Sequence, residues 1–590
     1  SSGDIFVDGT ISSSESNAVD NGGSIKILGN RIAIEDDAVV TTSGTNGGGE
    51  ILIGGNYLGK GPEPNASATV ILDGAVISAD ALVSGDGGRV IVWSDDYTNF
   101  RGLITARGTS DGKGGFVETS SKDNLQAFGS VDAYGGIEAG EWLLDPSDVT
   151  IGSSTSSGNF YSALFEPDTT SATVSASSIK TSLETVHVTI STHLNGADAD
   201  DAGSITFASG VSLENINTKA SGRRLTLFAS EDINVSETIS SSGGPLSIRL
   251  KAMGDVSITN NADIITKGGS FSVSGANADG DPDTEMATAE TAGSFLLDSG
   301  SEINTTGGTG AAGGAVTIKT STRSTSVSPT TDGDIEIKGN ITTSGGTASG
   351  AGLAGGAVTF NAGLDSAGNT AGTIEIFTGA DITTSGSAAA NSSGGAGAAA
   401  GAVTFDTNGE TIVLNDTTIT AIAGAADGGG ATASGGTITF SDNVSIATNG
   451  VTLTTGSTGG NIDFSGTIDG STTLSLTSGT GTIGLSGIVG GGTNLTGLTI
   501  PSSALTIDNN ISVAGDVSIT APVTLGGNVT IDTNTAGTDG DIDFSSTING
   551  GFNLTLDSGD ANVDIAGAIG TTGTGIGNLD INQSGGTGTI

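Results

Sequence analysis

Short segments of alternating apolar residues recur along the whole chain and constrain its fold more than any other feature. In the first part they begin at intervals of 20, 26, 19, 20 and 26 residues, at Ile5, Ile25, Ile51, Val70, Val90 and Phe116. Alternation with β-branched residues predicts strands, and the Gly, Ser, Asn and Asp clusters between them predict turns. One such strand cannot bury its apolar face alone, so successive repeats are expected to stack on one another.

A longer unit occupies the middle of the chain. It begins at intervals of 38, 41 and 37 residues, at Ile303, Ile341, Ile382 and Ile419. Each start is followed by a Gly/Ala/Ser-rich stretch of variable length, and then by a strand-like segment such as 315–318 or 357–360. Constant strands joined through one variable stretch predict loops that project from one side of a repeating body.

The last part repeats on another period. Residues 461–464 (Asn-Ile-Asp-Phe) match residues 541–544 (Asp-Ile-Asp-Phe), 80 positions later. Leu474 and Leu476 match Leu554 and Leu556 in the same register. The repeat therefore extends beyond one strand and predicts related coils at both positions.

These patterns predict an all-β fold: a single elongated, right-handed parallel β-helix (β-solenoid) with variable loops on one side and roughly 22 residues per coil. Glycine, 100 of the 590 residues, would occupy the corners, where positive φ is needed. A short helical turn is expected at 177–183, where Ile179 and Leu183 are four residues apart. A row of small β-sandwich domains is the competing interpretation.

Four segments are distinguished along the predicted β-helix. They comprise first coils at 1–151, coils with the helical turn at 152–300, coils of about 40-residue Gly/Ala-rich repeats at 301–440, and coils free of Lys and Arg with the 80-residue repeat at 441–590.

The net charge of the chain restricts the classes of partner that it can bind. The net charge is −46, from 64 acidic and 18 basic residues, which disfavours nucleic acid and anionic lipid surfaces. No apolar run approaches the roughly 20 residues of a membrane-spanning helix, so no membrane insertion is expected. Without cysteine, the chain can form neither disulfides nor thiolate metal sites.

Residues from about 50 to 151 carry a series of motifs in a characteristic order. The motifs are Ile53–Gly61 (IGGNYLGKG), Gly85–Trp93 (GDGGRVIVW), Gly114–Ser120 (GGFVETS) and Gly140–Ile151 (GEWLLDPSDVTI). Their order and spacing resemble the filamentous-haemagglutinin-like exoproteins of two-partner secretion in Gram-negative bacteria. The Trp142–Pro146 stretch is the most specific piece. Read from its residues alone, it is a core and corner element, with Pro146 at a turn and a new strand at 149–151.

The resemblance implies a secreted or surface-held β-helix that acts in adhesion, extracellular or on the outer surface of a Gram-negative bacterium. It implies that the full-length protein meets an outer-membrane two-partner-secretion pore through a domain that this sequence does not show, and the chain is accordingly expected to be an internal fragment. The expected partners are host or neighbouring cell surfaces, glycans among them, and self-association is a further candidate.

Enzymatic chemistry finds little support in the sequence. Residues 108–112 (Gly-Thr-Ser-Asp-Gly) match the Gly-x-Ser-x-Gly elbow, but no helical pattern follows the serine. Alternation places His187 on the outward side of a strand, and two isolated histidines, His187 and His193, do not make a zinc site without cysteine neighbours. The chain is therefore expected not to be an enzyme. Its expected role is a non-enzymatic adhesin shaft, with a structural filament or surface-layer component as the alternative and a polysaccharide-active enzyme as a weaker one.

No cofactor is expected, with calcium as the one candidate. Four carboxylates alternate along one loop, at Asp279, Asp281, Asp283 and Glu285. Calcium binds six to eight oxygen ligands and suits this spacing, although the EF-hand pattern is not met. A solvated acidic loop is the alternative.

All basic residues lie at or before Lys338, so residues 339–590 contain neither Lys nor Arg. Acids in this part therefore have no side-chain cation to pair with. Where stacking brings two of them one coil apart, they should repel each other and make stability rise with salt.

Overall fold

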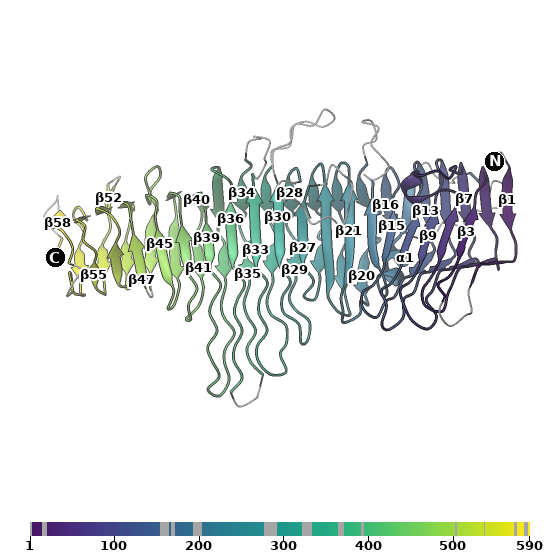
Figure 1. The fold of residues 1–590 in the computed structure, drawn as a ribbon. Coiled ribbons are helices and arrows are strands. Elements are labelled where there is room, and N and C mark those ends of the chain that lie inside the picture. Colours follow the sequence, from purple (N-terminus) through teal and green to yellow (C-terminus); the bar gives the residue numbers. More distant parts are fainter. Residues whose placement is uncertain are drawn as a thin grey trace. The chain divides into compact units, whose positions relative to one another are not determined.

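The computed structural model describes residues 3–14, 20–153, 164–166, 171–192, 203–275, 292–320, 333–363, 371–390, 394–501, 504–535, 537–571, 575–582 and 588–589. The chain divides into two compact units, Ser1–Asp263 with Val273–Ala292 and Ile264–Ser272 with Gly293–Ile590. Each unit is a parallel β-helix whose strands stack into long sheets (Figure 1). β26 (Asp263–Ile265) and β27 (Phe271–Ser274) contain the residues at which the units divide. This confirms the parallel β-helix and excludes the β-sandwich alternative.

Three sheets, called S1, S2 and S3, form the walls of the first unit, and each coil visits them in that order. S1 contains β1 (Asp4–Val7), β4 (Arg31–Ile34), β7 (Ala68–Ile71), β10 (Tyr97–Phe100), β13 (Asn124–Ala127), β17 (Ala172–Ser175), β16 (Val149–Gly152), β19 (Ile205–Phe207), β22 (Ile233–Val235) and β25 (Val256–Ile258). S2 contains β2 (Thr10–Ser12), β5 (Val39–Thr41), β8 (Val76–Ser78), β11 (Leu103–Thr105) and β14 (Ser130–Asp132), followed by β20 (Leu213–Ile216) and β23 (Ile239–Ser241). S3 contains β3 (Ser24–Ile27), β6 (Glu50–Ile53), β9 (Arg89–Val92), β12 (Phe116–Thr119), β15 (Glu141–Leu144), β18 (His187–Ser191), β21 (Arg223–Ala229) and β24 (Leu246–Ala252).

The predicted helical turn is α1 (Ala176–Ser182), and it interrupts S2. Ser175 caps its first turn by accepting the Ser178 N–H, and Ile179 and Leu183 are fully buried. The helix packs against β14 on one side and β20 on the other. The Ser182 hydroxyl accepts the N–H of Val131, a group of β14 that would otherwise bond to a strand. The helix therefore replaces one strand of S2 and meets the hydrogen-bonding needs of the strand beside it.

The Trp142–Pro146 stretch is a core and corner element, as its residues predict. Trp142 and Leu144 are fully buried, and the Trp142 indole N–H donates to the Thr119 hydroxyl of the preceding coil at 2.9 Å. Leu143 points the other way, yet is only 2% exposed because it packs with Phe228 and Leu58 outside S3. The three apolar residues therefore serve two separate clusters on opposite faces of one strand.

The second unit has the same three walls. S1 contains β28 (Phe295–Leu297), β31 (Ile335–Ile337), β34 (Ile374–Ile376), β37 (Thr411–Asn415), β40 (Asn443–Thr448) and β43 (Ile468–Gly470), then β48 (Ile511–Ser512), β51 (Val529–Asp532), β56 (Leu554–Asp557) and β58 (Leu579–Asn582). S2 contains β29 (Glu302–Asn304), β32 (Asn340–Thr342), β35 (Ile382–Thr383), β38 (Thr418–Thr420), β41 (Val451–Thr454), β44 (Thr473–Thr477), β46 (Gly497–Ile500), β49 (Val517–Ile519), β54 (Ile542–Phe544) and β57 (Val563–Ile565). S3 contains β30 (Val316–Thr320), β33 (Val358–Ala362), β36 (Val403–Asp406), β39 (Ile438–Phe440), β42 (Ile462–Phe464), β45 (Thr482–Leu485), β47 (Ala504–Ile507), β50 (Val523–Leu525) and β55 (Ile548–Asn549), and a small hairpin joins β52 (Asn534–Thr535) to β53 (Thr538–Asp539).

Identical residues stack in the core of the second unit. Phe360, Phe405, Phe440 and Phe464 lie on successive S3 strands, with ring centroids 5.1, 4.8 and 4.7 Å apart. The Ile starts of the middle repeat also pair in register, Ile303 with Ile341, then with Ile382 and Ile419. The period of about 40 residues is therefore one coil.

The Gly/Ala-rich stretches connect S2 to S3 and project together from one corner (Figure 1, the long loops below β35). Within one arm the N–H groups of Gly386 and Ala389 bond to the next loop, while those of Ser387 and Ala390 bond to the preceding one. Each pair is three residues apart, which is the period of polyproline II geometry rather than of a strand. Glycine permits the close packing, because a Cβ on Gly401 would lie 1.9 Å from the Gly356 carbonyl oxygen.

Coil length differs from the expected value of about 22 residues. In the first unit S3 pairs residues 26 positions apart (Ser24 and Glu50), 39 apart (Glu50 and Arg89) and 27 apart (Arg89 and Phe116). The expected coil length was wrong here because the apolar segments that gave it belong to strands of both S1 and S3, and the strands of S2 were missed. It holds near the end of the second unit, where Ile462 pairs with Ile483, 21 positions away.

The 80-residue repeat does not return to the same wall. Residues 462–464 form β42 in S3, whereas 542–544 form β54 in S2. Leu474 and Leu476 lie in S2, and their matches Leu554 and Leu556 lie in S1. The shift is the same for both pairs, so the repeat spans a whole number of strands but not of coils.

Asn and Asp side chains reinforce the corners of the second unit. Asn528 accepts the N–H of Asn553 at 3.0 Å, and Asn553 accepts that of Asn578 at 2.8 Å. Asp516 and Asp541 form a parallel series, in which Asp516 accepts the Asp541 N–H at 3.0 Å. Acids that lack a basic side chain therefore find backbone donors on the following coil.

Candidate functional site: a charged groove in the first unit

One outward column of S3 collects chemically distinctive side chains. Strand register places Glu50 beside Arg89, Arg89 beside Phe116, Phe116 beside Glu141, and Glu141 beside His187. These residues are 25 to 46 positions from their neighbours in sequence and become adjacent only through stacking. Three of the motifs in 85–151 contribute to the column, at Arg89, Phe116 and Glu141.

A glycine floor runs beside this column. Gly49, Gly88, Gly115 and Gly140 each precede an S3 strand, and a Cβ on Gly115 would lie 2.0 Å from the Gly88 carbonyl oxygen. Because no side chain fits there, the corner stays open as a groove of about 980 Å³. Asp86, Lys113, Glu138, Arg224 and Arg249 are among its other lining residues.

Ion pairs balance the charges along the groove. The contacts are Arg89–Glu50 at 3.3 Å, Lys113–Glu138 at 2.8 Å and Arg224–Glu141 at 2.9 Å. The hydrogen bond between Lys113 and Glu138 holds the pKa of Glu138 below its usual value and raises the pKa of Lys113. Glu141 also accepts the Thr189 hydroxyl, so its two oxygens have separate partners. The groove therefore presents fixed, paired charges.

His187 lies on the outward side of β18, as predicted, and is half-buried in the groove. Its Nδ1 accepts the backbone N–H of Arg224 at 3.0 Å, which assigns the proton to Nε2 in the neutral ring. Burial, followed by the charges of Arg224 and Arg223, lowers its pKa to about 4. At neutral pH the ring can donate from Nε2 but has no free basic nitrogen to accept a proton.

Glu118 is a buried acid that sequence reasoning did not single out. Segment 54–65, called the flap, covers the outer side of S3, and the Leu58 N–H donates to both Glu118 oxygens at 3.2 and 3.3 Å. Leu58 adopts φ of 55°, and the Glu118 side chain has no exposed area. Burial, and then the charge of Asp145, raise the pKa of Glu118 to about 8. The sequence signal was a Glu at an outward position of a strand, two residues after Phe116 of the same motif.

The flap itself is held by polar contacts at both ends. Glu63 bonds to Lys26 and to Asn56, each at 2.7 Å, and Asn65 bonds to Asp95 at 2.9 Å. The lysine bond, followed by the asparagine bond, lowers the pKa of Glu63 to about 2. The first motif of the resemblance, 53–61, therefore contains the end of β6 and the larger part of the flap, which covers the strands of the next motifs.

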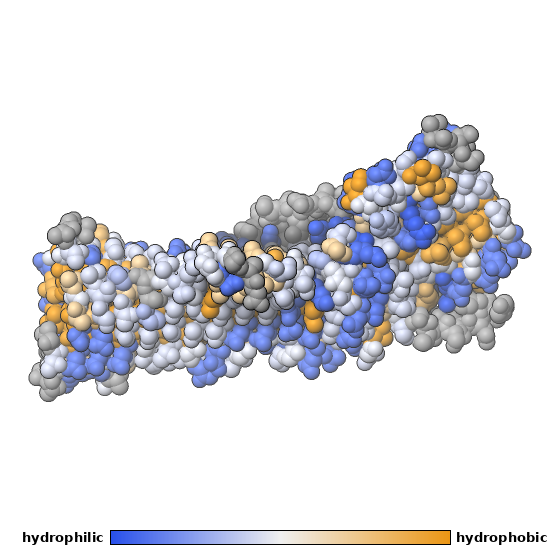
Figure 2. Space-filling model, turned by 90° about the horizontal axis from the view of Figure 1, so that it is seen from below, coloured by the Kyte–Doolittle hydropathy of each residue, from blue (hydrophilic) through white to orange (hydrophobic). Residues whose placement is uncertain are grey.

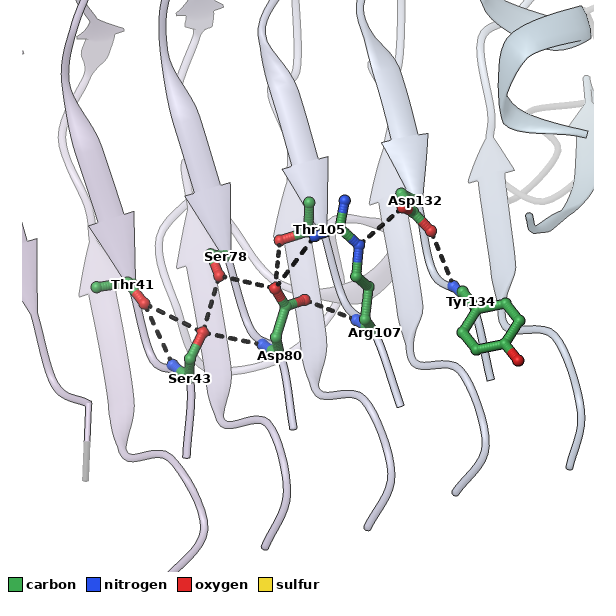
Figure 3. Close-up of polar contacts among 8 residues, drawn as sticks. All are labelled: Thr41, Ser43, Ser78, Asp80, Thr105, Arg107, Asp132 and Tyr134. Carbon is green, nitrogen blue, oxygen red and sulfur yellow. Dashed lines mark hydrogen bonds and ion pairs between the residues drawn. The ribbon is translucent and has the colours of Figure 1, made fainter. Parts of the chain in front are cut away.

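A polar face on S2 forms the second notable surface of this unit (Figure 3). Asp80 accepts hydrogen bonds from Ser78, Thr105 and the Arg107 N–H, and donates its own N–H to Ser43. Arg107 Nε donates to Asp132 at 2.7 Å. The contacts connect four successive coils, from β5 to β14.

The structure does not test most of the other residues selected from the sequence. Asp279, Asp281, Asp283, Glu285 and His193 lie outside the described residues. Ser110 of the Gly-x-Ser-x-Gly match lies in a turn that leads into β12, so no helix follows it as a nucleophile elbow requires. Within the described part of the chain, no three His, Asp or Glu side chains are positioned to hold a metal ion.

No described helix is long and apolar enough to cross a membrane. Neither protein-family models nor curated proteins show a match to the chain.

Proposed function

We propose that the chain is the non-enzymatic shaft of a large secreted or surface-held bacterial adhesin, which displays contact surfaces to other cells. The observation that carries the proposal is the groove, where acids and bases from successive coils are fixed to one another instead of being free for catalysis. A β-helix that presents preorganised side chains on successive coils suits binding, because little conformational freedom is lost on contact.

The motif series supports the extracellular setting. Its four segments form one continuous structural feature, from the flap to the groove wall and the corner after β15. That coherence supports the resemblance to two-partner-secretion exoproteins, with the outer surface of a Gram-negative bacterium as location and an outer-membrane pore as the partner of the full-length protein.

The direct test is adhesion of cells to the purified, immobilised chain. Adhesion that survives Glu141→Gln and His187→Gln is expected, together with no release of oligosaccharides from acidic or neutral polysaccharides. If none of the tested bacterial or animal cells adhered, the adhesin role would be contradicted. Oligosaccharide release that Glu141→Gln abolishes would instead establish a polysaccharide-active enzyme.

A structural filament or surface-layer component is the second candidate. The returning arms of two projecting loops expose alanine residues three positions apart, Ala312 with Ala315 and Ala351 with Ala354. Figure 2 views these loops end-on and shows mostly pale residues at their centre. Because these loops carry almost no charge on a chain of net charge −46, they suit contact with a second copy. Concentration-dependent ordered fibres without any cell ligand would favour this role.

A further inference from the structure

The S2 face of the first unit brings an arginine between two carboxylates. Asp80 follows β8, Arg107 follows β11, and Asp132 ends β14, so the three residues lie on successive coils (Figure 3). Arg107 Nε donates to Asp132 Oδ2 at 2.7 Å, and Arg107 Nη1 lies 3.9 Å from Asp80 Oδ2. Tyr134 follows Asp132 and donates its backbone N–H to that carboxylate at 3.1 Å.

This arrangement is held by ion pairs and remains accessible. The Arg107 side chain is 46% exposed, whereas Asp80 and Asp132 are 14% and 23% exposed. Two nitrogens of the guanidinium face the carboxylates, and Nη2 makes no hydrogen bond to the described residues. The free edge of a planar donor is therefore presented between two acceptors, with its orientation already fixed.

Apolar surface adjoins the polar row. Tyr134 is 39% exposed, and Leu82, Val83 and Ile137 are 61, 71 and 66% exposed. Backbone bonds from Ala81 to the Arg107 carbonyl and from Gly108 to the Tyr134 carbonyl place the three loops in consecutive layers. Donors, acceptors, an aromatic ring and aliphatic side chains thus lie on one corner of the unit.

We propose that Asp80, Arg107, Asp132 and Tyr134 bind an uncharged glycan. A pyranose presents neighbouring hydroxyls, which both donate and accept, beside a face of C–H groups. The carboxylates match the hydroxyl donors, the free guanidinium edge matches the acceptors, and Tyr134 matches the C–H face. The net charge of −46 repels sulfated and sialylated chains, which selects the uncharged class. This inference rests on the proposed adhesive function and names its ligand.

The test uses the full chain on an array of uncharged oligosaccharides with glucose, galactose, mannose or N-acetylglucosamine ends, with heparin and sialylated chains as anionic arms. Binding to at least one uncharged class is expected, with weak dependence on salt and no retention on the anionic arms. Arg107→Ala and Tyr134→Ala should each weaken it at least about tenfold.

Arg31→Ala is the matched control, because Arg31 is 45% exposed and paired with Asp4 on S1 instead. It should bind as the unmodified chain does, and equal melting temperatures would show that all variants are folded. Arg107→Lys, which keeps the charge and loses the fork, should resemble Arg107→Ala.

Three results would overturn the inference: no uncharged glycan bound, unchanged binding in Arg107→Ala, or an equal loss in Arg31→Ala. Cell adhesion measured on the same surfaces separates the two proposals. If cells adhere without glycan binding, the inference fails and the adhesin role stands. If glycans bind but no cells adhere, the adhesin role fails instead.

Discussion

The Thr384 hydroxyl donates to the Gly401 carbonyl oxygen at 2.6 Å, across a sequence separation of 17 residues. The same bond joins Thr305 to Gly314, Thr343 to Gly356 and Thr455 to Gly460, with sequence separations of 9, 13 and 5. Each threonine follows an S2 strand and each glycine precedes an S3 strand. One buried hydroxyl therefore closes the base of each of these four loops, whatever its length, and lets their lengths differ without disturbing the walls.

Replacing this hydroxyl should weaken the second unit. Thr384→Val keeps the shape and leaves the buried carbonyl with one donor fewer, so the free energy of unfolding should fall by about 1–3 kcal/mol. Thr384→Ser should lose much less. Urea unfolding measures both, with Thr347→Val as the control because Thr347 is exposed in a neighbouring loop. Equal stability of the two Thr384 variants would show that the bond contributes nothing.

Glycine packing within the projecting loops can be tested in the same way. A Cβ on Gly356 would lie 2.0 Å from the Gly314 carbonyl oxygen, whereas one on Gly350 meets no atom within 4 Å. Gly356→Ala should therefore lower the free energy of unfolding by about 1–3 kcal/mol, and Gly350→Ala should not lower it. A similar loss in both would mean that the arms are not stacked as described.

Part of this structure could be predicted from the sequence, and part could not. Alternating Val and Ile residues identified β30, β33, β36 and β39, and four-residue spacing identified α1, because these patterns are local. The Thr–Gly bonds escaped detection because their two residues stand 5 to 17 positions apart, at the two ends of loops of different length. The three-residue period of the arms escaped because its hydrogen bonds need partners on other coils. The groove escaped for the same reason. Glu141, His187 and Arg224 stand far apart in sequence, and only the register of β15, β18 and β21 shows that they meet.

The buried acid under the flap should make stability depend on pH. The folded-state pKa of Glu118, about 8, lies above the ordinary value of a glutamate. Its contribution to the stability of the folded state is therefore complete below about pH 4.5 and is lost as pH rises toward 8. His187 acts oppositely, because its lowered pKa favours the folded state as pH rises from about 4 to 6.5. Between about pH 6.5 and 8, stability should therefore fall because of Glu118.

Glu118→Gln should remove that fall, as measured by melting temperature and by Trp93 fluorescence beside the flap. Glu138→Gln is the control, because the pKa of this acid is lowered and it stays charged throughout the window. A slope that survives Glu118→Gln would assign it to another group.

Salt should stabilise the second unit. Asp543 and Asp564 are register partners, with no Lys or Arg beyond residue 338 to pair with them. Burial, followed by the charges of Asp541 and Asp564, raises the pKa of Asp543. Melting temperature should rise with ionic strength and in Asp543→Asn, whereas Asp580→Asn, at an exposed position, should have little effect. A melting temperature that falls with salt would show that these acids are stabilised by pairing.

The central claim is that distant residues meet through parallel stacking in a defined register, and a cysteine pair tests it most directly in a chain without native cysteine. Thr359 and Thr404 are register partners on adjacent S3 strands, within the distance a disulfide can span. Thr359→Cys with Thr404→Cys should oxidise to an intramolecular disulfide almost completely. Thr359→Cys with Asp406→Cys, two residues out of register, should not. Equal oxidation of both pairs, or of neither, would contradict the register and with it the surfaces that it builds.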